Sequence, residues 1–381
     1  MTRLDIKRWF SARWAVLDAP MLWILAGLMC MGMVNMWSAT SGNPAKFVDQ
    51  LRNFGIAFAV MWAFAHVPPQ TVMRFAVPAY VLGVALLLAV MLFGDVSKGA
   101  RRWLNLGVTR IQPSEIMKIA MPLMLAWYFA RHESLLRVRD FVIAALLLAL
   151  PLALIAKQPD LGTALLVGAA GLYVLYFAGL SFKLIVPLMV LGSLAAASLF
   201  VFESSICQDD IQWPLMHDYQ KQRVCTLLDP SSDPLGKGFH TIQSTIAVGS
   251  GGAIGKGFMR GTQAQLEFLP ERSTDFAYAV FAEEWGFAGG LLLLALFTAL
   301  LFRGLLIATH APTLFSRLLA GSLTLIVFTY TAVNMGMVIG ILPVVGVPMP
   351  FISYGGTALL TIGVACGMLM SIQRHRSLIQ S

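Results

Sequence analysis

Long apolar segments recur along this chain of 381 residues, and they limit its fold more than any other feature. A helix that crosses the hydrocarbon core of a bilayer requires about 20 apolar residues. Because hydrophobic residues make up 58% of the chain and charged residues only 12%, an ordinary soluble domain is excluded. We expect an all-α polytopic membrane protein with about ten spanning helices, in a single domain over residues 1–381. The predicted spans are 20–40, 50–67, 73–94, 114–131, 140–157, 160–180, 182–202, 276–304, 316–342 and 351–373.

The distribution of Lys and Arg predicts how these spans are oriented. Cytoplasmic connections retain positive charge, and an even number of spans places both termini on the same side. One set of span ends carries cations throughout, among them Arg3, Arg13, Arg131 and Arg317, so we expect both termini in the cytoplasm. The net charge of +8 reflects this topology and attraction to anionic membrane lipid. Because the cations form no stripe with interleaved aromatic residues, no nucleic-acid partner is expected.

The connection 203–275 is too long to be a structureless linker, and we expect short helices packed on the rim of the bundle. Cys207 and Cys225 both lie in it. An oxidising compartment would permit a disulfide between them, and two buried free thiols are the alternative. The glycine-rich stretch 249–257 suits backbone nests that bind anions, although glycine pairs are common in loops.

Residues 268–276 (FLPERSTDF) bring three ionisable groups to the start of an apolar helix: Glu271, Arg272 and Asp275. Ionisable groups at a membrane boundary are costly and are therefore candidates for function. Ser273 or Thr274 is predicted to cap the helix, which places Asp275 in its first turn, where the helix dipole favours an ionised carboxylate. Such a carboxylate, if reached by water, suits a general base. The alternative is that acids are simply common in first turns.

Glu283 follows Asp275 on the same predicted helix. At 100° and 1.5 Å per residue, it lies about 12 Å deeper and is offset by about 80°. We therefore expect Glu283 to support or shape the site and not to share a proton with Asp275.

Two further acid–base pairs lie at the ends of predicted spans. Glu115 and Lys118 are three residues apart and share one helical face, either as a structural ion pair or as the lining of a polar cavity. Lys157 and Asp160 form a similar pair. Both pairs are predicted on the same membrane face as Asp275, so all three features are expected to share one cavity.

The connection 95–112 carries Arg101, Arg102 and Trp103 on the side opposite the termini. Its mixture of cations, tryptophan and leucine is typical of a segment in the lipid interface. The arginines either extend to the interface or contact phosphate groups of a lipid-linked substrate, for which their fork geometry is suited. No cluster of His and Cys predicts a metal site, and His217 and His240 are expected to be surface or packing residues.

Several motifs resemble those of the shape, elongation, division and sporulation (SEDS) family, and the similarity covers essentially the whole chain. They occur in order as Gln112-Pro-Ser-Glu115, Gln158-Pro-Asp-Leu-Gly-Thr163, residues 217–236, 246–252, 268–276 and 340–348, and Ser353-Tyr-Gly-Gly356. The connection 203–275 is more similar to the elongation branch of the family than to the division branch. Ser273 stands where the family often has histidine, and the pair of cysteines is not general in the family.

This resemblance implies a peptidoglycan glycosyltransferase that polymerises lipid II into a growing glycan strand at the periplasmic face of the bacterial inner membrane. Its implied partner is a class B penicillin-binding protein. The essential aspartate of the family corresponds to Asp275, whereas Glu115, Lys118 and Asp160 match polar positions of the family's central cavity. No cofactor is certain, and a divalent cation, Mg²⁺ or Mn²⁺, is one option.

The implied reaction is an inverting displacement in which one carboxylate and several positive charges suffice. Asp275 would remove the proton of the attacking sugar hydroxyl, and undecaprenyl pyrophosphate would leave. The positive charge would come from a divalent ion or from cationic side chains: Lys118, Lys157, Arg101 and Arg102. The alternatives are a lipid II flippase and a non-catalytic scaffold of the elongation complex.

Overall fold

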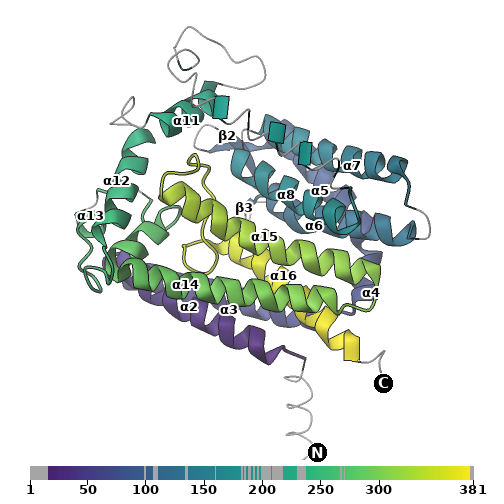
Figure 1. The fold of residues 1–381 in the computed structure, drawn as a ribbon, viewed down its shortest axis with the longest axis horizontal. Helices are drawn as coiled ribbons and strands as arrows, with labels where there is room; N and C mark the ends of the chain where they lie inside the picture. The colour runs from purple at the N-terminus through teal and green to yellow at the C-terminus, as the bar shows by residue number, and fades with distance from the viewer. Residues whose placement is uncertain are drawn as a thin grey trace, which may run out of the picture.

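The computed structural model describes residues 16–97, 100–105, 110–133, 136–158, 160–181, 218–229, 237–266, 268–269 and 271–377, with Cys207 and scattered positions between 183 and 198. Its long helices form one bundle, and shorter helices gather at one end, on the left in Figure 1. We call this the loop end. The first helix begins and the last helix ends toward the opposite end of the bundle (Figure 1).

The bundle consists of α2 (Ala19–Ala39), α3 (Pro44–His66), α4 (Pro69–Arg74), α5 (Ala76–Phe93), α6 (Pro113–Arg131), α7 (Val138–Lys157), α8 (Leu161–Phe177), α14 (Ala277–Thr309), α15 (Leu314–Val338) and α16 (Gly356–Ser377). Every predicted span coincides with a helix except 182–202, which lies largely outside the described residues. Among the described helices, α2, α5, α7, α14, α15 and α16 are long and apolar enough to cross a membrane. The protein is therefore a multi-pass membrane protein, as expected.

Helix α6 lies at the centre of this bundle, in contact with α5, α7, α8, α15 and α16. Because other helices surround it, α6 can carry Lys118 buried and Glu115 largely buried near its start. Helix α15 is similarly enclosed, whereas α2, α5 and α7 bury about one face each. The most buried helices therefore carry polar side chains, which can form hydrogen bonds with other residues inside the bundle.

A small antiparallel sheet interrupts the helical fold between α5 and α6. Its strands β1 (Asp95–Ser97), β2 (Ala100–Asn105) and β3 (Arg110–Ile111) lie in the order β1-β2-β3, with Leu104 opposite Ile111. Strand β2 packs on α5 and α6, and Leu104 is its buried residue. The all-α expectation missed this sheet because strands of two to six residues are too short to show a clear alternation.

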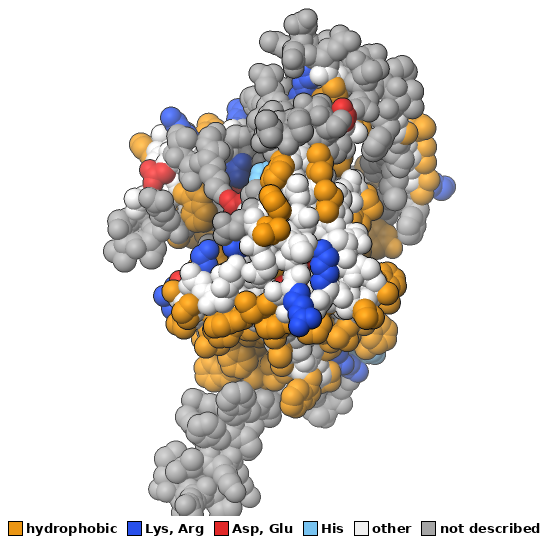
Figure 2. All heavy atoms as spheres, turned by 90° about the vertical axis from the view of Figure 1, so that its left-hand side faces the viewer, with side chains coloured by type: hydrophobic (Ala, Val, Ile, Leu, Met, Phe, Trp, Pro, Cys, Tyr) orange, Lys and Arg blue, Asp and Glu red, His pale blue; other side chains and the backbone are white. Residues whose placement is uncertain are grey.

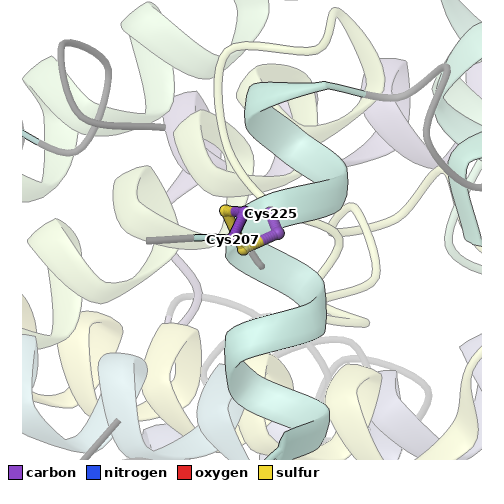
Figure 3. Close-up of a disulfide and its surroundings, with 2 residues drawn as sticks. All are labelled: Cys207 and Cys225. Atoms are coloured by element: carbon purple, nitrogen blue, oxygen red, sulfur yellow. A yellow bond between two sulfur atoms is a disulfide. The ribbon is translucent and has the colours of Figure 1, made fainter. Parts of the chain in front are cut away.

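The long connection contains α11 (Asp218–Leu228), α12 (Lys237–Ser250) and α13 (Thr262–Gln265), which confirms the prediction of short helices. Helix α12 packs against α14 and α15. A disulfide joins Cys207 to Cys225 on α11, as one of the two alternatives predicted, and Figure 3 shows it on the flank of that helix. The bond ties the start of the connection to α11, which in turn contacts α12.

Candidate active site at the loop end

Asp275 lies in a turn over residues 271–276 that leads into α14, and its side chain is half-buried. The residue at the N-terminal cap of α14 is Phe276, without a side-chain hydrogen bond. The predicted cap by Ser273 or Thr274 is therefore wrong, and Asp275 precedes the first turn instead of lying in it. The Thr274 hydroxyl instead donates to the Glu271 carboxylate at 2.9 Å, across a turn in which Glu271 has a φ of 51°.

Three other parts of the chain hold this turn in place. The side-chain amide of Asn334 on α15 donates to the backbone carbonyl of Asp275 at 2.8 Å. The backbone N–H of Tyr354 donates to the carbonyl of Ser273 at 2.7 Å. Arg272 donates to the carbonyl of Ala264 on α13. Arg272 thus supports the turn, and the side chain of Glu271 does so through Thr274.

The connection between α15 and α16, residues 339–355, runs alongside Asp275 at the loop end. Gly346 in this connection has a φ of +72°, and a Cβ atom added there would lie 3.4 Å from Asp275 Oδ2. A Cβ atom added at Gly162, in the first turn of α8, would lie 2.7 Å from the carbonyl oxygen of Val345. Glycine at these two positions therefore lets one connection contact both Asp275 and the start of α8, where Asp160 lies.

Asp160 caps α8 and is almost completely buried. Its carboxylate accepts hydrogen bonds from the Thr163 hydroxyl and from the Gln112 side-chain amide, both at 2.9 Å. Gln112 immediately precedes α6, so this bond joins the start of α8 to the start of α6.

The pair Glu115–Lys118 is formed, with 2.6 Å between Lys118 Nζ and Glu115 Oε1. Lys118 is only 2% exposed, and it also donates to the Tyr330 hydroxyl at 2.7 Å. The Thr361 hydroxyl of α16 donates to the other oxygen of Glu115 at 3.1 Å. Three helices are thus joined by one buried polar cluster.

This cluster borders a groove of about 850 Å³ between α4, α5, α6 and α16. Gln112, Glu115 and Thr361 contribute the polar part of its wall. The rest is apolar and includes Phe64, Val67, Ile119, Leu123, Leu360 and Met368. Both readings of the Glu115–Lys118 pair therefore hold, because it is a structural ion pair that also lines a cavity.

Lys157 does not take part in the predicted pair with Asp160. In the part of the chain that the structure describes, the two form no ion pair, and Lys157 is exposed at the end of α7. The next residue, Gln158, turns inward and donates to the carbonyl of Leu87 at 3.0 Å, so Lys157 faces away from the bundle. Arg101 is also exposed, on β2, beside the partly buried Arg102 and Trp103.

Glu283 is completely buried and supports the loop end, as expected. It pairs with Lys256 at 2.6 Å and accepts hydrogen bonds from the Thr262 hydroxyl and the Gln263 backbone N–H at 3.0 and 3.1 Å. Its bonds hold the segment between α12 and α13 against α14.

The anion nests predicted in residues 249–257 are not formed. The N–H groups of Gly255, Lys256 and Gly257 donate to the carbonyls of Gly251, Glu283 and Glu284. A Cβ atom added at Gly255 would lie 2.1 Å from the Glu284 carbonyl oxygen. These glycines therefore permit close backbone packing against α14, and their donors are already used.

Three residues that organise the site were not predicted from the sequence: Asn334, Asn35 and Tyr330. Each lies inside a predicted apolar span, and a polar side chain in such a span is itself a signal of an internal partner. His240, expected to be a surface or packing residue, packs with its ring stacked on Phe276 at 5.8 Å between centroids. His217 lies outside the described residues. Among the described residues, no three His, Cys, Asp or Glu side chains form a group that could hold a metal ion.

Comparisons with known proteins agree with this architecture. Residues 16–378 match the FtsW, RodA and SpoVE family model, described as cell cycle protein. A peptidoglycan glycosyltransferase MrdB of Escherichia coli (strain K12) is 48% identical over 363 residues, which cover 95% of each chain. A solved structure described as structural coordination of polymerization and crosslinking by a peptidoglycan synthase complex matches with a TM-score of 0.76 and 32% identity, over 94% of this chain and 98% of that one. The rod shape determining protein RodA of Thermus thermophilus matches with a TM-score of 0.70 and 27% identity, over 95% and 98%.

Proposed function

The chain belongs to the FtsW, RodA and SpoVE family of cell cycle proteins, and we infer from this and from its site that it is a peptidoglycan glycosyltransferase. We propose that it polymerises lipid II into glycan strands during cell elongation, with Asp275 as the general base. The observation that carries the proposal is the position of Asp275 in a turn fixed by three separate parts of the chain, at the end of the bundle where the polar cluster and the groove also begin.

The proposed step needs one carboxylate. Asp275 takes the proton of a sugar hydroxyl on one lipid-linked substrate as that oxygen attacks the anomeric carbon of the other. The bond from that carbon to the pyrophosphate oxygen breaks on the opposite side, so the configuration inverts. Undecaprenyl pyrophosphate leaves with the electron pair and requires nearby positive charge instead of a second acid. A fixed base within hydrogen-bond reach contributes through both orientation and proton transfer.

The exposed cations suit the pyrophosphate better than the buried one does. Lys118 is almost completely buried and already donates to Glu115 and Tyr330, so it is poorly accessible to a substrate. Arg101 is exposed on β2, next to the strand β3 that leads to Gln112 in the groove wall. Figure 2 shows further Lys and Arg side chains on the loop end. A divalent cation, Mg²⁺ or Mn²⁺, is proposed as a second source of charge, held largely by the substrate phosphates.

The groove between α4, α5, α6 and α16 is proposed to hold the undecaprenyl chain of a substrate. Its volume of about 850 Å³ and its largely apolar wall suit an isoprenoid. Its polar part, with Gln112 and Glu115, would lie near the head group. An apolar chain bound there leaves the sugar and pyrophosphate at the loop end, toward Asp275.

The proposed location is the bacterial inner membrane, with both termini in the cytoplasm and the loop end in the periplasm. The distribution of cations supports this orientation. The proposed partner is a class B penicillin-binding protein that crosslinks the strands. The match to a structure of a peptidoglycan synthase complex, in which polymerization and crosslinking are coordinated, supports such a partner.

The deciding experiment measures glycan polymer formed from lipid II by the purified protein with its partner, for the native protein and for Asp275→Ala and Asp275→Asn. Both variants are expected to lose polymerisation by at least about 100-fold, which is the order that a general base contributes. Asp49→Asn is the matched control, because Asp49 is a partly exposed carboxylate that pairs with Arg52 on the surface of α3. Native polymer yield from Asp275→Ala would refute the base, and native activity of Asp275→Asn in lipid II transport alone would favour a flippase.

A further inference from the structure

One buried side chain on α15 connects the two segments that border Asp275. The amide nitrogen of Asn334 donates to the backbone carbonyl of Asp275 at 2.8 Å and to that of Val347 at 2.7 Å. Asn334 is 0% exposed. A single NH₂ group thus holds the turn of the base and the connection that runs beside it.

A second buried asparagine, on α2, holds the backbone next to this turn. Asn35 on α2 is 1% exposed, and its amide nitrogen donates to the carbonyl of Ala277 at 3.0 Å. Residues 275 and 277 are therefore both held by buried amides, from α15 and from α2. The backbone at the base and two residues after it is thus held by helices that are remote from it in the sequence.

The orientation of the Asn334 amide follows from its surroundings. Rotating the amide by 180° would place its oxygen against two carbonyl oxygens, so the nitrogen must face them. The Oδ1 atoms of Asn334 and Asn35 are buried and have no hydrogen-bond partner among the described residues. A buried acceptor without a partner is unfavourable, and a side chain chosen for stability alone would not leave one in place.

The second carbonyl held by Asn334 lies where the connection 339–355 contacts Asp275. Val347 follows Gly346, whose left-handed backbone leaves room for the carboxylate of Asp275. Because it bonds the carbonyls of residues 275 and 347, Asn334 sets the distance between Asp275 and the connection 339–355. A shift of either segment would change the direction in which the carboxylate points.

We propose that Asn334 is a positioning residue that orients Asp275 for proton transfer, with Asn35 as a second support. This inference rests on the proposed function, because it assigns Asn334 to the base of that reaction. The side chain acts through the backbone and does not touch the substrate. Its loss should therefore lower the rate of the chemical step and leave substrate binding nearly unchanged.

The test compares steady-state polymerisation of lipid II by the purified protein with its partner for Asn334→Ala and Ser322→Ala. Ser322 is the matched control, because it is a fully buried polar residue on the same helix whose hydroxyl donates to the Ala170 carbonyl at 2.8 Å. Asn334→Ala is expected to lower kcat by about 10- to 100-fold with KM within about twofold, as for a misplaced catalytic group. Ser322→Ala is expected to keep native kcat per folded molecule, even where its melting temperature falls.

Asn334→Asp adds a readout that a purely structural role would not move. A carboxyl group buried there and facing two carbonyl oxygens stays protonated and can donate to only one of them, so Asn334→Asp should recover part of the kcat that Asn334→Ala loses. Equal kcat for Asn334→Asp and Asn334→Ala, or equal losses of kcat in Asn334→Ala and Ser322→Ala, would overturn the positioning role. If Asp275→Ala polymerises like the native protein, the assignment of Asp275 as the base is refuted, and the positioning role of Asn334 is refuted with it. If only Asn334→Ala is native-like, the base stands and the positioning role alone is refuted.

Discussion

Breaking the buried pair Glu115–Lys118 should destabilise the bundle strongly. The change Lys118→Met removes an ion pair of 2.6 Å and a hydrogen bond of 2.7 Å to Tyr330. It leaves the Glu115 carboxylate, whose side chain is 14% exposed, with the Thr361 hydroxyl as its remaining partner in the described bundle. An uncompensated buried charge of this kind costs about 3–5 kcal/mol.

Neutralising the second partner should restore most of that loss. In the double variant Glu115→Gln/Lys118→Met, the amide of residue 115 can still accept from Thr361, and no charge remains unpaired. Replacing a buried pair by neutral residues is close to neutral in energy, so we expect a total loss of about 1–2 kcal/mol. The double variant should therefore be about 2–3 kcal/mol more stable than Lys118→Met alone.

Both quantities are measurable by reversible denaturant unfolding of the protein in detergent micelles. Tyr330→Phe serves as the matched control, because it removes one hydroxyl acceptor from Lys118 and keeps the ion pair, with an expected loss of about 1 kcal/mol. A loss below about 1 kcal/mol for Lys118→Met would mean that Glu115 is solvated and not buried. A double variant as unstable as the single one would refute the coupling.

The remaining predictions concern the long connection. Cys225→Ser should lower the free energy of unfolding by about 3 kcal/mol, because the disulfide closes a loop with a sequence separation of 18, and reducing agent should affect the native protein alone. Burial against Phe276 lowers the pKa of His240, although Glu271 opposes the shift. The imidazole of His240 therefore binds a proton more tightly in the unfolded chain than in the folded protein. Its contribution to the free energy of unfolding is fully present above the unfolded pKa of about 6.5, and it is lost as the pH falls through the lower pKa of the folded state. The native protein should thus melt at a lower temperature at pH 5.5 than at pH 7.5, and His240→Phe should show a smaller difference in a thermal scan.

The membrane-spanning helices were predictable because their signal is local. About 20 apolar residues in a row identify α2, α14 or α15 whatever surrounds them. The spacing of Glu115 and Lys118 likewise predicts their pairing, since three residues place them on one helical face. The pair Lys157–Asp160 has the same spacing and fails, because α7 ends between them and α8 starts afresh.

Features that depend on distant partners were not predictable. Asn334 reaches a carbonyl 59 residues away, and no spacing rule connects the two positions. The glycines of residues 249–257 suit an anion nest and close packing equally well in sequence. Only the position of Glu284 opposite Gly255 decides between them. The cap of α14 is a similar case. The sequence allowed the hydroxyl of Thr274 to cap the helix, but in the folded turn that hydroxyl donates to the Glu271 carboxylate.

The break in α14 shows why the loop end depends on so much of the chain. At Gly286 the helix adopts a φ of 63°, and the N–H groups of Phe287 and Ala288 donate to the carbonyls of Gly252 and Ala253, both at 2.9 Å. The segment between α12 and α13 therefore completes the backbone bonding of α14, and Glu283 fixes it there through Lys256.

This arrangement assigns the acids of the loop end to different tasks. Glu283 holds Lys256, Asp160 caps α8, and Glu115 holds Lys118, so proton transfer at any of these carboxylates would disrupt a structural bond. The turn that carries Asp275 is held through backbone carbonyls, by Asn334 at residue 275 and by Tyr354 at residue 273. These bonds do not involve the carboxylate, so they would persist when its protonation state changes, as the proposed role of general base requires.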